Sequence, residues 1–118
     1  MRVTGAVLQP SDRRVKQDIV PVDTEAQLRN IQALGLYSYT LKPEWTASVG
    51  IADAPAQCGV LAQELQQLIP AAVRPAGDHT MADGSVIEQL LTVDKERLHM
   101  EALGAIKALA NKSDRLEA

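Results

Sequence analysis

The sequence predicts an α+β fold in which short strands and helices lead into one long C-terminal helix. Three observations support this class. The stretch "LYSYTLK" alternates in the manner of a strand, and apolar residues recur at helical spacing after Thr24. Residues 93–118 contain no proline and keep a helical pattern to the end. The 118 residues suit one domain or a piece of a longer protein.

The N-terminal elements follow from local signals. Residues 3–9, "VTGAVLQ", predict a short strand, and Pro21 argues against a regular helix through the charged stretch that follows. Thr24 is the predicted N-cap of a helix, and Gly35 is its predicted C-cap. The apolar face of this helix consists of Leu28, Ile31 and Leu34.

The middle of the chain predicts two more strands, a helix and a hairpin. "LYSYTLK" is a strand that Pro43 ends, and the Gly, Pro and Ala content of residues 44–57 predicts a loop. "CGVLAQELQQLIP" begins as a short strand and continues as a helix that stops at Pro70. Residues 71–90 predict a hairpin or loop with turns at "AGD" and "ADG".

The C-terminal helix has apolar residues at heptad spacing. The predicted seam comprises Leu98, Ala102, Ala105, Leu109 and Leu116, with Lys112 in the remaining slot. Leu103 and Ile106 broaden the stripe, which favours a homotrimeric helical bundle or coiled coil over a two-stranded one. Fewer than four full heptads also fit an amphipathic helix that packs within its own domain. The pattern leaves both alternatives open.

Composition excludes several classes of function for this fragment. The net charge is −3 and no basic stripe is present, so direct nucleic-acid binding is not expected. No apolar run reaches the length of a membrane span, and no membrane contact by this fragment is expected. Aromatic residues make up only 3%, so the aliphatic core of such a small chain favours help from neighbouring copies. Cys58 stands alone, and we expect it to be a small buried apolar residue.

Ser11 and Lys16, five residues apart, are the candidates for chemistry. A serine hydroxyl becomes a good nucleophile when a base takes its proton. A lysine acts as that base only when neutral, which requires burial or a nearby positive charge such as that of Arg13 or Arg14. Attack on the preceding carbonyl would cut the Pro10–Ser11 bond. The alternative is a polar turn with an exposed lysine, because serine and lysine are common residues.

Several blocks of sequence together resemble a known family. "SDRRVKQDIVPVDT", "LYSYTLKPE", "GVLAQELQQLIPAAV" and "DGSVIEQLLTVDKERLHMEALGAIKAL" occur in this order. They resemble the intramolecular chaperone, auto-processing domain at the C-termini of phage tailspikes and endosialidases, which opens with Ser-Asp-x-Arg-x-Lys. Blocks such as "VDTEAQLRNI" and "LKPE" are closer to the myelin regulatory factor branch of membrane-tethered transcription factors. The resemblance covers about residues 5–118.

The resemblance implies a self-cleaving trimerisation domain with a Ser-Lys dyad, an autocatalytic serine endopeptidase that acts once. Residues 1–10 would end the upstream segment, 11–118 would form the domain, and 92–118 would be its trimerisation helix. The catalytic residues would be Ser11 and Lys16, and the substrate would be the chain's own upstream region. Asp12 and Arg14 match the motif without a derived role. Gln63 and Glu64 match a recurrent family block, where a structural role in helix capping or packing is open beside a catalytic one.

The branch determines what the cut would release. In the myelin regulatory factor branch, a precursor tethered to the endoplasmic reticulum membrane releases an N-terminal part to the nucleus. In the phage branch, a mature tail fibre or tailspike is released into the virion tail. A non-catalytic trimerisation module is the further alternative. We expect no cofactor and no metal, because His79 and His99 lack partner ligands and "GDHTMADG" does not match a calcium loop.

Overall fold

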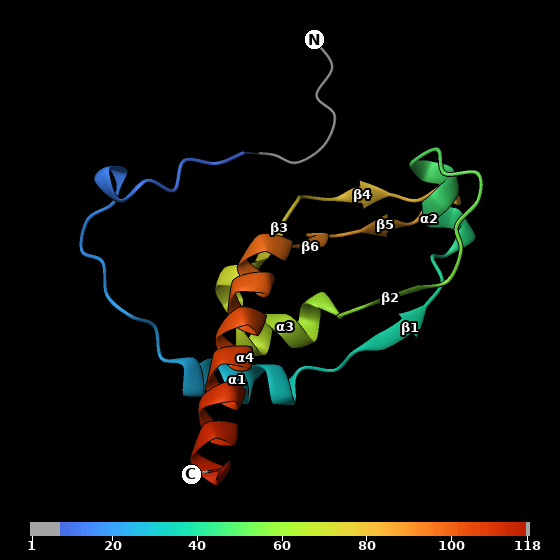
Figure 1. Ribbon diagram of the computed structural model, residues 1–118. Coiled ribbons are helices and arrows are strands. Elements are labelled where there is room, and N and C mark those ends of the chain that lie inside the picture. Colours follow the sequence, from blue (N-terminus) through green and yellow to red (C-terminus); the bar gives the residue numbers. More distant parts are fainter. Residues whose placement is uncertain (1–7, 118) are drawn as a thin grey trace.

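The computed structural model describes residues 8–117, arranged around one long helix (Figure 1). The helices are η1 (Arg13–Val15), α1 (Thr24–Ala33), α2 (Pro43–Ser48), α3 (Ala62–Leu68), η2 (Pro70–Ala72) and α4 (Lys95–Glu117), where η marks a 3₁₀ helix. The strands are β1 (Tyr37–Tyr39), β2 (Gln57–Gly59), β3 (Val73–Pro75), β4 (His79–Thr80), β5 (Val86–Ile87) and β6 (Leu91–Val93). Mixed short strands, helices and a long last helix confirm the predicted α+β class. Most of the predicted strand at residues 3–9 lies outside the described residues.

The strands form three antiparallel pairs. β1 pairs with β2, with Tyr37 opposite Gly59. β3 pairs with β6 and β4 pairs with β5. Backbone hydrogen bonds from Ala76 N to Leu90 O and from Leu90 N to Gly77 O join the two pairs into one bent hairpin. The predicted hairpin at residues 71–90 is therefore confirmed. Its tip turns at Gly84, whose φ of +90° suits a residue without a Cβ atom.

Two apolar clusters hold the helices together. In the first, Leu28 of α1 packs on Ala105 and Ala108 of α4. The second cluster joins α3, η2 and β3 through four buried residues, and Leu98 of α4 packs against it. Its buried residues are Leu65, Ile69, Ala72 and Val73. These clusters fix α4 as the central element against which the other segments are positioned.

α1 approaches α4 closely at Gly104. A Cβ atom on Gly104 would overlap the end of the Gln27 side chain, which would then have to move from its present place beside Glu101. Next to it, the buried carboxylate of Glu101 accepts hydrogen bonds from Asn30 Nδ2 at 2.8 Å and Arg97 Nη1 at 2.8 Å. Gln27 Nε2 donates to the same carboxylate at 3.4 Å. A polar contact therefore fixes the register of α1 on α4 beside the apolar one.

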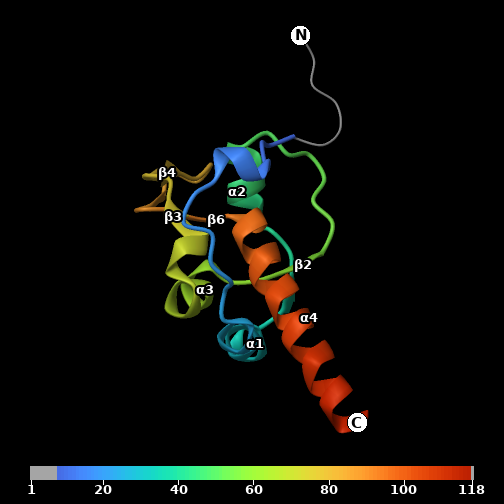
Figure 2. The same ribbon diagram turned by 60° about the vertical axis from the view of Figure 1, so that its left-hand side comes forward.

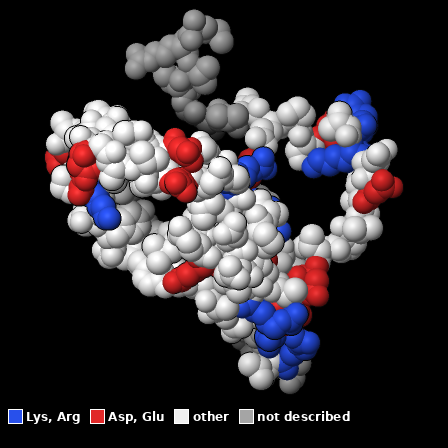
Figure 3. Space-filling model, turned by 180° about the vertical axis from the view of Figure 1, so that it is seen from behind, with Lys and Arg blue, Asp and Glu red and all other residues white. Residues whose placement is uncertain are grey.

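Residues 8–23 form a strap that stands away from the body. Figures 1 and 2 show it leaving the region of α4, turning at η1 and returning to α1. From behind, Figure 3 shows open space between the strap and the rest of the molecule. The apolar side chains of the strap are exposed: Val15, Ile19, Val20 and Val22. In the single chain the strap therefore has an unpacked apolar surface.

Several helix boundaries differ from those predicted. The N-cap of α1 is Asp23, not Thr24, because the Asp23 carboxylate accepts a hydrogen bond from Ala26 N at 3.1 Å. The C-cap is Leu34, one residue before Gly35. α4 begins at Lys95, later than the predicted residue 92, because Leu91–Val93 pair with β3 and Asp94 then caps the helix by accepting from Arg97 N.

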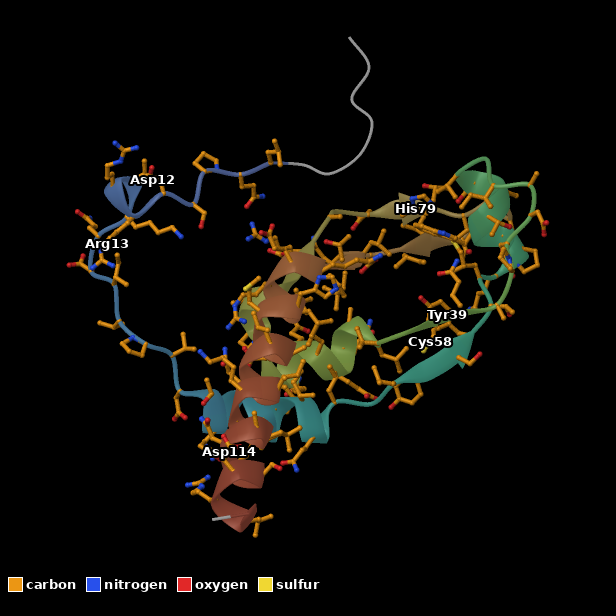
Figure 4. The ribbon with its side chains drawn as sticks, viewed as in Figure 1. Asp12, Arg13, Tyr39, Cys58, His79 and Asp114 are labelled. Atoms are coloured by element: carbon orange, nitrogen blue, oxygen red, sulfur yellow. The ribbon has the colours of Figure 1, made fainter. Side chains whose placement is uncertain are left out.

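Two further expectations were wrong. The predicted loop at residues 44–57 contains α2, and Pro43 begins that helix instead of only ending the strand before it. Proline suits the first helical position because its missing N–H would have no partner there. Cys58 is exposed, not buried, because it lies on the two-stranded β1–β2 ribbon, which no other layer covers on that side. Figure 4 shows Cys58 and Tyr39 on this ribbon.

Candidate functional site

The structure brings Ser11 and Lys16 together. Lys16 Nζ donates a hydrogen bond to Ser11 Oγ at 2.7 Å. Both side chains are exposed in the single chain. Figure 4 shows their segment by the labelled Asp12 and Arg13, at the outer turn of the strap and far from His79 at the opposite end of the molecule. A contact across five residues requires the backbone between them to turn back.

Asp12 and Arg14 build that turn. Asp12 caps η1 by accepting a hydrogen bond from Arg14 N at 2.8 Å, and the Arg14 guanidinium donates to the same carboxylate through Nε at 3.1 Å and Nη2 at 2.8 Å. These hydrogen bonds from Arg14 hold the pKa of Asp12 below its usual value. Lys16 N then closes the turn on Arg13 O at 3.1 Å. The two motif residues without a derived role are thus the ones that bend the chain.

The bond before Ser11 lies in a pocket between the strap and α4. The pocket has a volume of about 510 Å³, and its lining residues are Gln9, Pro10, Ser11, Lys16, Glu96 and Met100. Gln9 Nε2 donates to Glu96 Oε2 at 3.2 Å. Glu96 and Met100 lie one turn apart in α4, so the start of this helix forms the wall opposite the strap. Sequence reasoning missed both residues, because their charged and apolar types are ordinary on a helix surface.

The other motif residues lie elsewhere. Glu64 of α3 accepts from Tyr37 Oη at 2.6 and 2.8 Å, which fastens β1 to α3 and, through that hydrogen bond, raises the pKa of Tyr37. Gln63 lines a second pocket with Tyr39 and residues of the hairpin. The residues that line the Ser11 pocket include neither Gln63 nor Glu64.

The predicted seam of α4 divides between two environments. Ala105 is buried by α1 within the chain, while Leu98 and Ala102 are half-buried. Leu109 and Leu116 are exposed, and so are Met100, Leu103 and Ile106. The side chains that a second copy can reach therefore centre on Ile106 and Leu109.

The remaining polar candidates have local roles. Ser48 Oγ donates to Trp45 O at 2.7 Å and lies 2.8 Å from His79 Nε2, within hydrogen-bond distance. The His79 ring also packs on Trp45 with centroids 4.3 Å apart. Within residues 8–117 no cluster of His, Cys, Asp or Glu has the arrangement of a metal site. None of the helices in that range combines the length and apolarity needed to cross a membrane.

Comparison with protein families identifies the domain. The family described as "Chaperone of endosialidase" matches residues 11–74, more than half of the chain. The chain belongs to the chaperone-of-endosialidase family. Its C-terminal residues 91–118 match the "Myelin regulatory factor ICA domain". The family match begins at Ser11, the residue at which the proposed cut would start the domain.

Relatives place this chaperone domain beside the myelin regulatory factors. It is 37% identical over 113 residues to "Myelin gene regulatory factor-like A" of Dictyostelium discoideum, covering 94% of this chain and 12% of that protein. It is 30% identical over 116 residues to "Myelin regulatory factor homolog 1" of Caenorhabditis elegans, covering 98% of this chain and 11% of that protein. An uncharacterised protein of Dictyostelium discoideum is 38% identical over 115 residues, covering 95% of this chain and 10% of that protein. The chain thus spans about a tenth of the length of these relatives.

A solved structure shares the fold of this chaperone domain. A crystal structure described as "a novel intramolecular chaperon" matches with a TM-score of 0.55 at 16% identity, covering 86% of this chain and 99% of that one. At this identity the likeness concerns the arrangement of elements and not individual side chains. The fold is therefore that of an intramolecular chaperone.

Proposed function

We propose that this domain cuts its own chain at the Pro10–Ser11 bond, with Ser11 as nucleophile and Lys16 as base. The contact of 2.7 Å between Lys16 Nζ and Ser11 Oγ is the observation on which the proposal rests. It has the short distance that proton transfer between a nucleophile and its base requires. Family membership supports the coarser role, an intramolecular chaperone that acts on the segment before it.

The reaction consumes one water molecule. Neutral Lys16 takes the proton of Ser11 Oγ as that oxygen attacks the carbonyl carbon of Pro10. The C–N bond then breaks, the proton passes to the amino group of Ser11, and the Pro10 acyl group becomes an ester on Ser11 Oγ. Water hydrolyses this ester to give a carboxylate at Pro10 and a new N-terminus at Ser11.

Assembly as a homotrimer would switch the reaction on. Lys16 is exposed to water in the single chain, whereas the proposed base must be neutral to accept a proton. A neighbouring copy that packs on the apolar strap and on the exposed side chains of α4 would remove water from Lys16 and favour the neutral amine. The family resemblance and the exposed Ile106 and Leu109 support trimer formation through α4, the helix within the proposed trimerisation segment 92–118.

The cut would separate the upstream part of a longer protein from this domain. The regulatory-factor names of the relatives favour a released transcription-factor part over a phage fibre. In that case the precursor would be held at the endoplasmic reticulum membrane by a segment outside residues 1–118. The released part would then act in the nucleus.

Intact mass of the purified protein, extended upstream by a folded tag, tests the cleavage. We expect a product that begins at Ser11, and no such product from Ser11→Ala or Lys16→Ala. Sedimentation of the same samples gives the oligomeric state. If the wild-type protein stays full length while it sediments as a trimer, the cleavage proposal is wrong.

The exposure of Lys16 favours a second function, a trimerisation module in which Ser11 and Lys16 are inert. Solvent around the amine in the assembled trimer would leave it charged and unable to accept a proton. The mass experiment separates the two functions, because the module assembles but never produces a chain that begins at Ser11.

A further inference from the structure

We propose that Glu96 is a positioning residue for the cut, and that it acts by holding the side chain of Gln9. This inference rests on the proposed cleavage at Pro10–Ser11. Gln9 lies directly before Pro10, on the side of the bond that is released. Its amide nitrogen reaches Glu96 Oε2 at 3.2 Å, across 87 residues of sequence.

Glu96 stands on a rigid part of the molecule, whereas Gln9 does not. α4 is fixed in the body by Leu98, which packs on the core cluster, and by the buried Glu101 network. The strap has few contacts of this kind and leaves its apolar residues exposed. A hydrogen bond from the strap to α4 therefore limits where the residues next to the cut can go.

The contact acts on the scissile carbonyl through Pro10. The proline ring restricts φ at that residue, so fixing Gln9 on one side also restricts the position of the Pro10 carbonyl on the other. The turn capped by Asp12 restricts Ser11 and Lys16 from the downstream side. Holding both sides of a reacting bond raises the fraction of molecules in the productive geometry.

The contact exists only before the cut. Gln9 leaves with the upstream part, whereas Glu96 stays in the domain. Glu96 thus recognises a feature of the substrate, a hydrogen-bond donor directly before Pro10. This makes the residue at position 9 a determinant of cleavage rate, although it is neither nucleophile nor base.

An exchange of the two side chains tests the contact. Cleavage of the tagged protein is followed by mass for Glu96→Ala, Gln9→Glu, and Gln9→Glu with Glu96→Gln. We expect Glu96→Ala to cut about three- to tenfold more slowly, the effect of losing one exposed hydrogen bond to a charged group. Gln9→Glu places two carboxylates together and slows the cut at least as much. The double exchange restores an amide facing a carboxylate and recovers most of the rate.

Controls separate positioning from general damage. Glu88→Ala removes an exposed carboxylate at the hairpin and keeps the wild-type rate. Circular dichroism and sedimentation show whether each variant is folded and assembled. Wild-type rates in every variant would overturn the role of Glu96 and leave the cleavage proposal intact, as would a folded double exchange without recovery. An uncut wild-type protein would instead overturn the cleavage proposal, and the positioning role with it.

Discussion

At the scale of single residues, Asp12 sets the geometry of Ser11 and Lys16. Its carboxylate accepts the N-terminal N–H of η1 and also binds the Arg14 guanidinium. Together with the backbone hydrogen bond from Lys16 N to Arg13 O, these contacts restrain the backbone between Ser11 and Lys16. The turn therefore depends on a residue that does not take part in proton transfer.

Substitution of Asp12 tests this dependence. We expect Asp12→Ala to slow cleavage by about three- to tenfold, because losing a helix cap costs about 1 kcal/mol and fewer molecules keep the turn. Asp12→Asn retains the capping oxygen, so its cleavage rate should fall less than that of Asp12→Ala. Asp53→Ala, in an exposed loop, serves as the control. Equal rates for all three variants, measured by mass over time, would show that the turn forms without the cap.

Lys16→Arg separates a base from a hydrogen-bond donor. Arginine keeps the positive charge and can donate to Ser11 Oγ, but its guanidinium does not lose a proton at accessible pH. We expect a chain that assembles normally and stays uncut over days. A product beginning at Ser11 in this variant would exclude residue 16 as the general base. Intact mass and sedimentation of one sample give both results.

At the scale of elements, α1 approaches α4 closely at Gly104. In an exposed helix, Gly→Ala stabilises by about 1 kcal/mol through helix propensity. Here we expect the opposite sign, a loss of about 1–3 kcal/mol, because the new methyl group displaces the end of the buried Gln27 side chain from its hydrogen bond to Glu101. Gly104→Ala combined with Gln27→Ala should recover much of the loss. Urea denaturation gives the free energy of unfolding of the wild type, of Gly104→Ala and of the double variant. A Gly104→Ala protein as stable as the wild type would contradict this packing.

The same pairing predicts a sensitivity to acid. Burial acts to raise the pKa of Glu101, but hydrogen bonds from Asn30 and Arg97 outweigh it and hold the pKa below its ordinary value of 4.5. The stabilisation is therefore complete above pH 4.5 and is lost as pH falls through the lower pKa of the folded state. We expect Glu101→Gln to remove this part of the acid sensitivity and to lower stability at pH 7. Urea titrations at pH 7 and pH 3.5 give the free energy of unfolding of the wild type and of Glu101→Gln at each pH.

Local signals predicted most elements, and distant contacts explain the misses. The hairpin and the last helix follow from turn residues and periodicity, which act over a few residues. Pro43 is ambiguous locally, because proline both ends a strand and begins a helix. Ala105 fits a heptad, yet it faces α1 because Leu28 comes from a segment 77 positions earlier. Ser11 and Lys16 are five residues apart, so their pairing could be predicted from the sequence. Gln9 and Glu96 are 87 residues apart, so their contact could not.

At the scale of the whole molecule, the chain is more extended than a compact domain of its length. Its radius of gyration is 18.5 Å, with extents of 58 × 37 × 25 Å. A compact domain of this length would have about 13.5 Å. The excess comes from the projecting strap and the protruding end of α4 (Figure 1). Near this end, Lys112 and Arg115 face Glu25. The strap and the end of α4 both leave apolar residues in water, which favours burial against further copies.

If assembly activates cleavage, a substitution on α4 that prevents assembly must also prevent cleavage. Ile106 is 61% exposed, so Ile106→Asp should leave the folded chain intact. A charge there would oppose burial between copies, and we expect monomers that stay uncut. Asn111→Asp adds the same charge at an exposed polar position of α4 and should assemble and cut normally. Sedimentation and intact mass are measured together at several concentrations. Monomeric Ile106→Asp protein that still yields a chain beginning at Ser11 would show that the Ser11–Lys16 pair works without neighbouring copies.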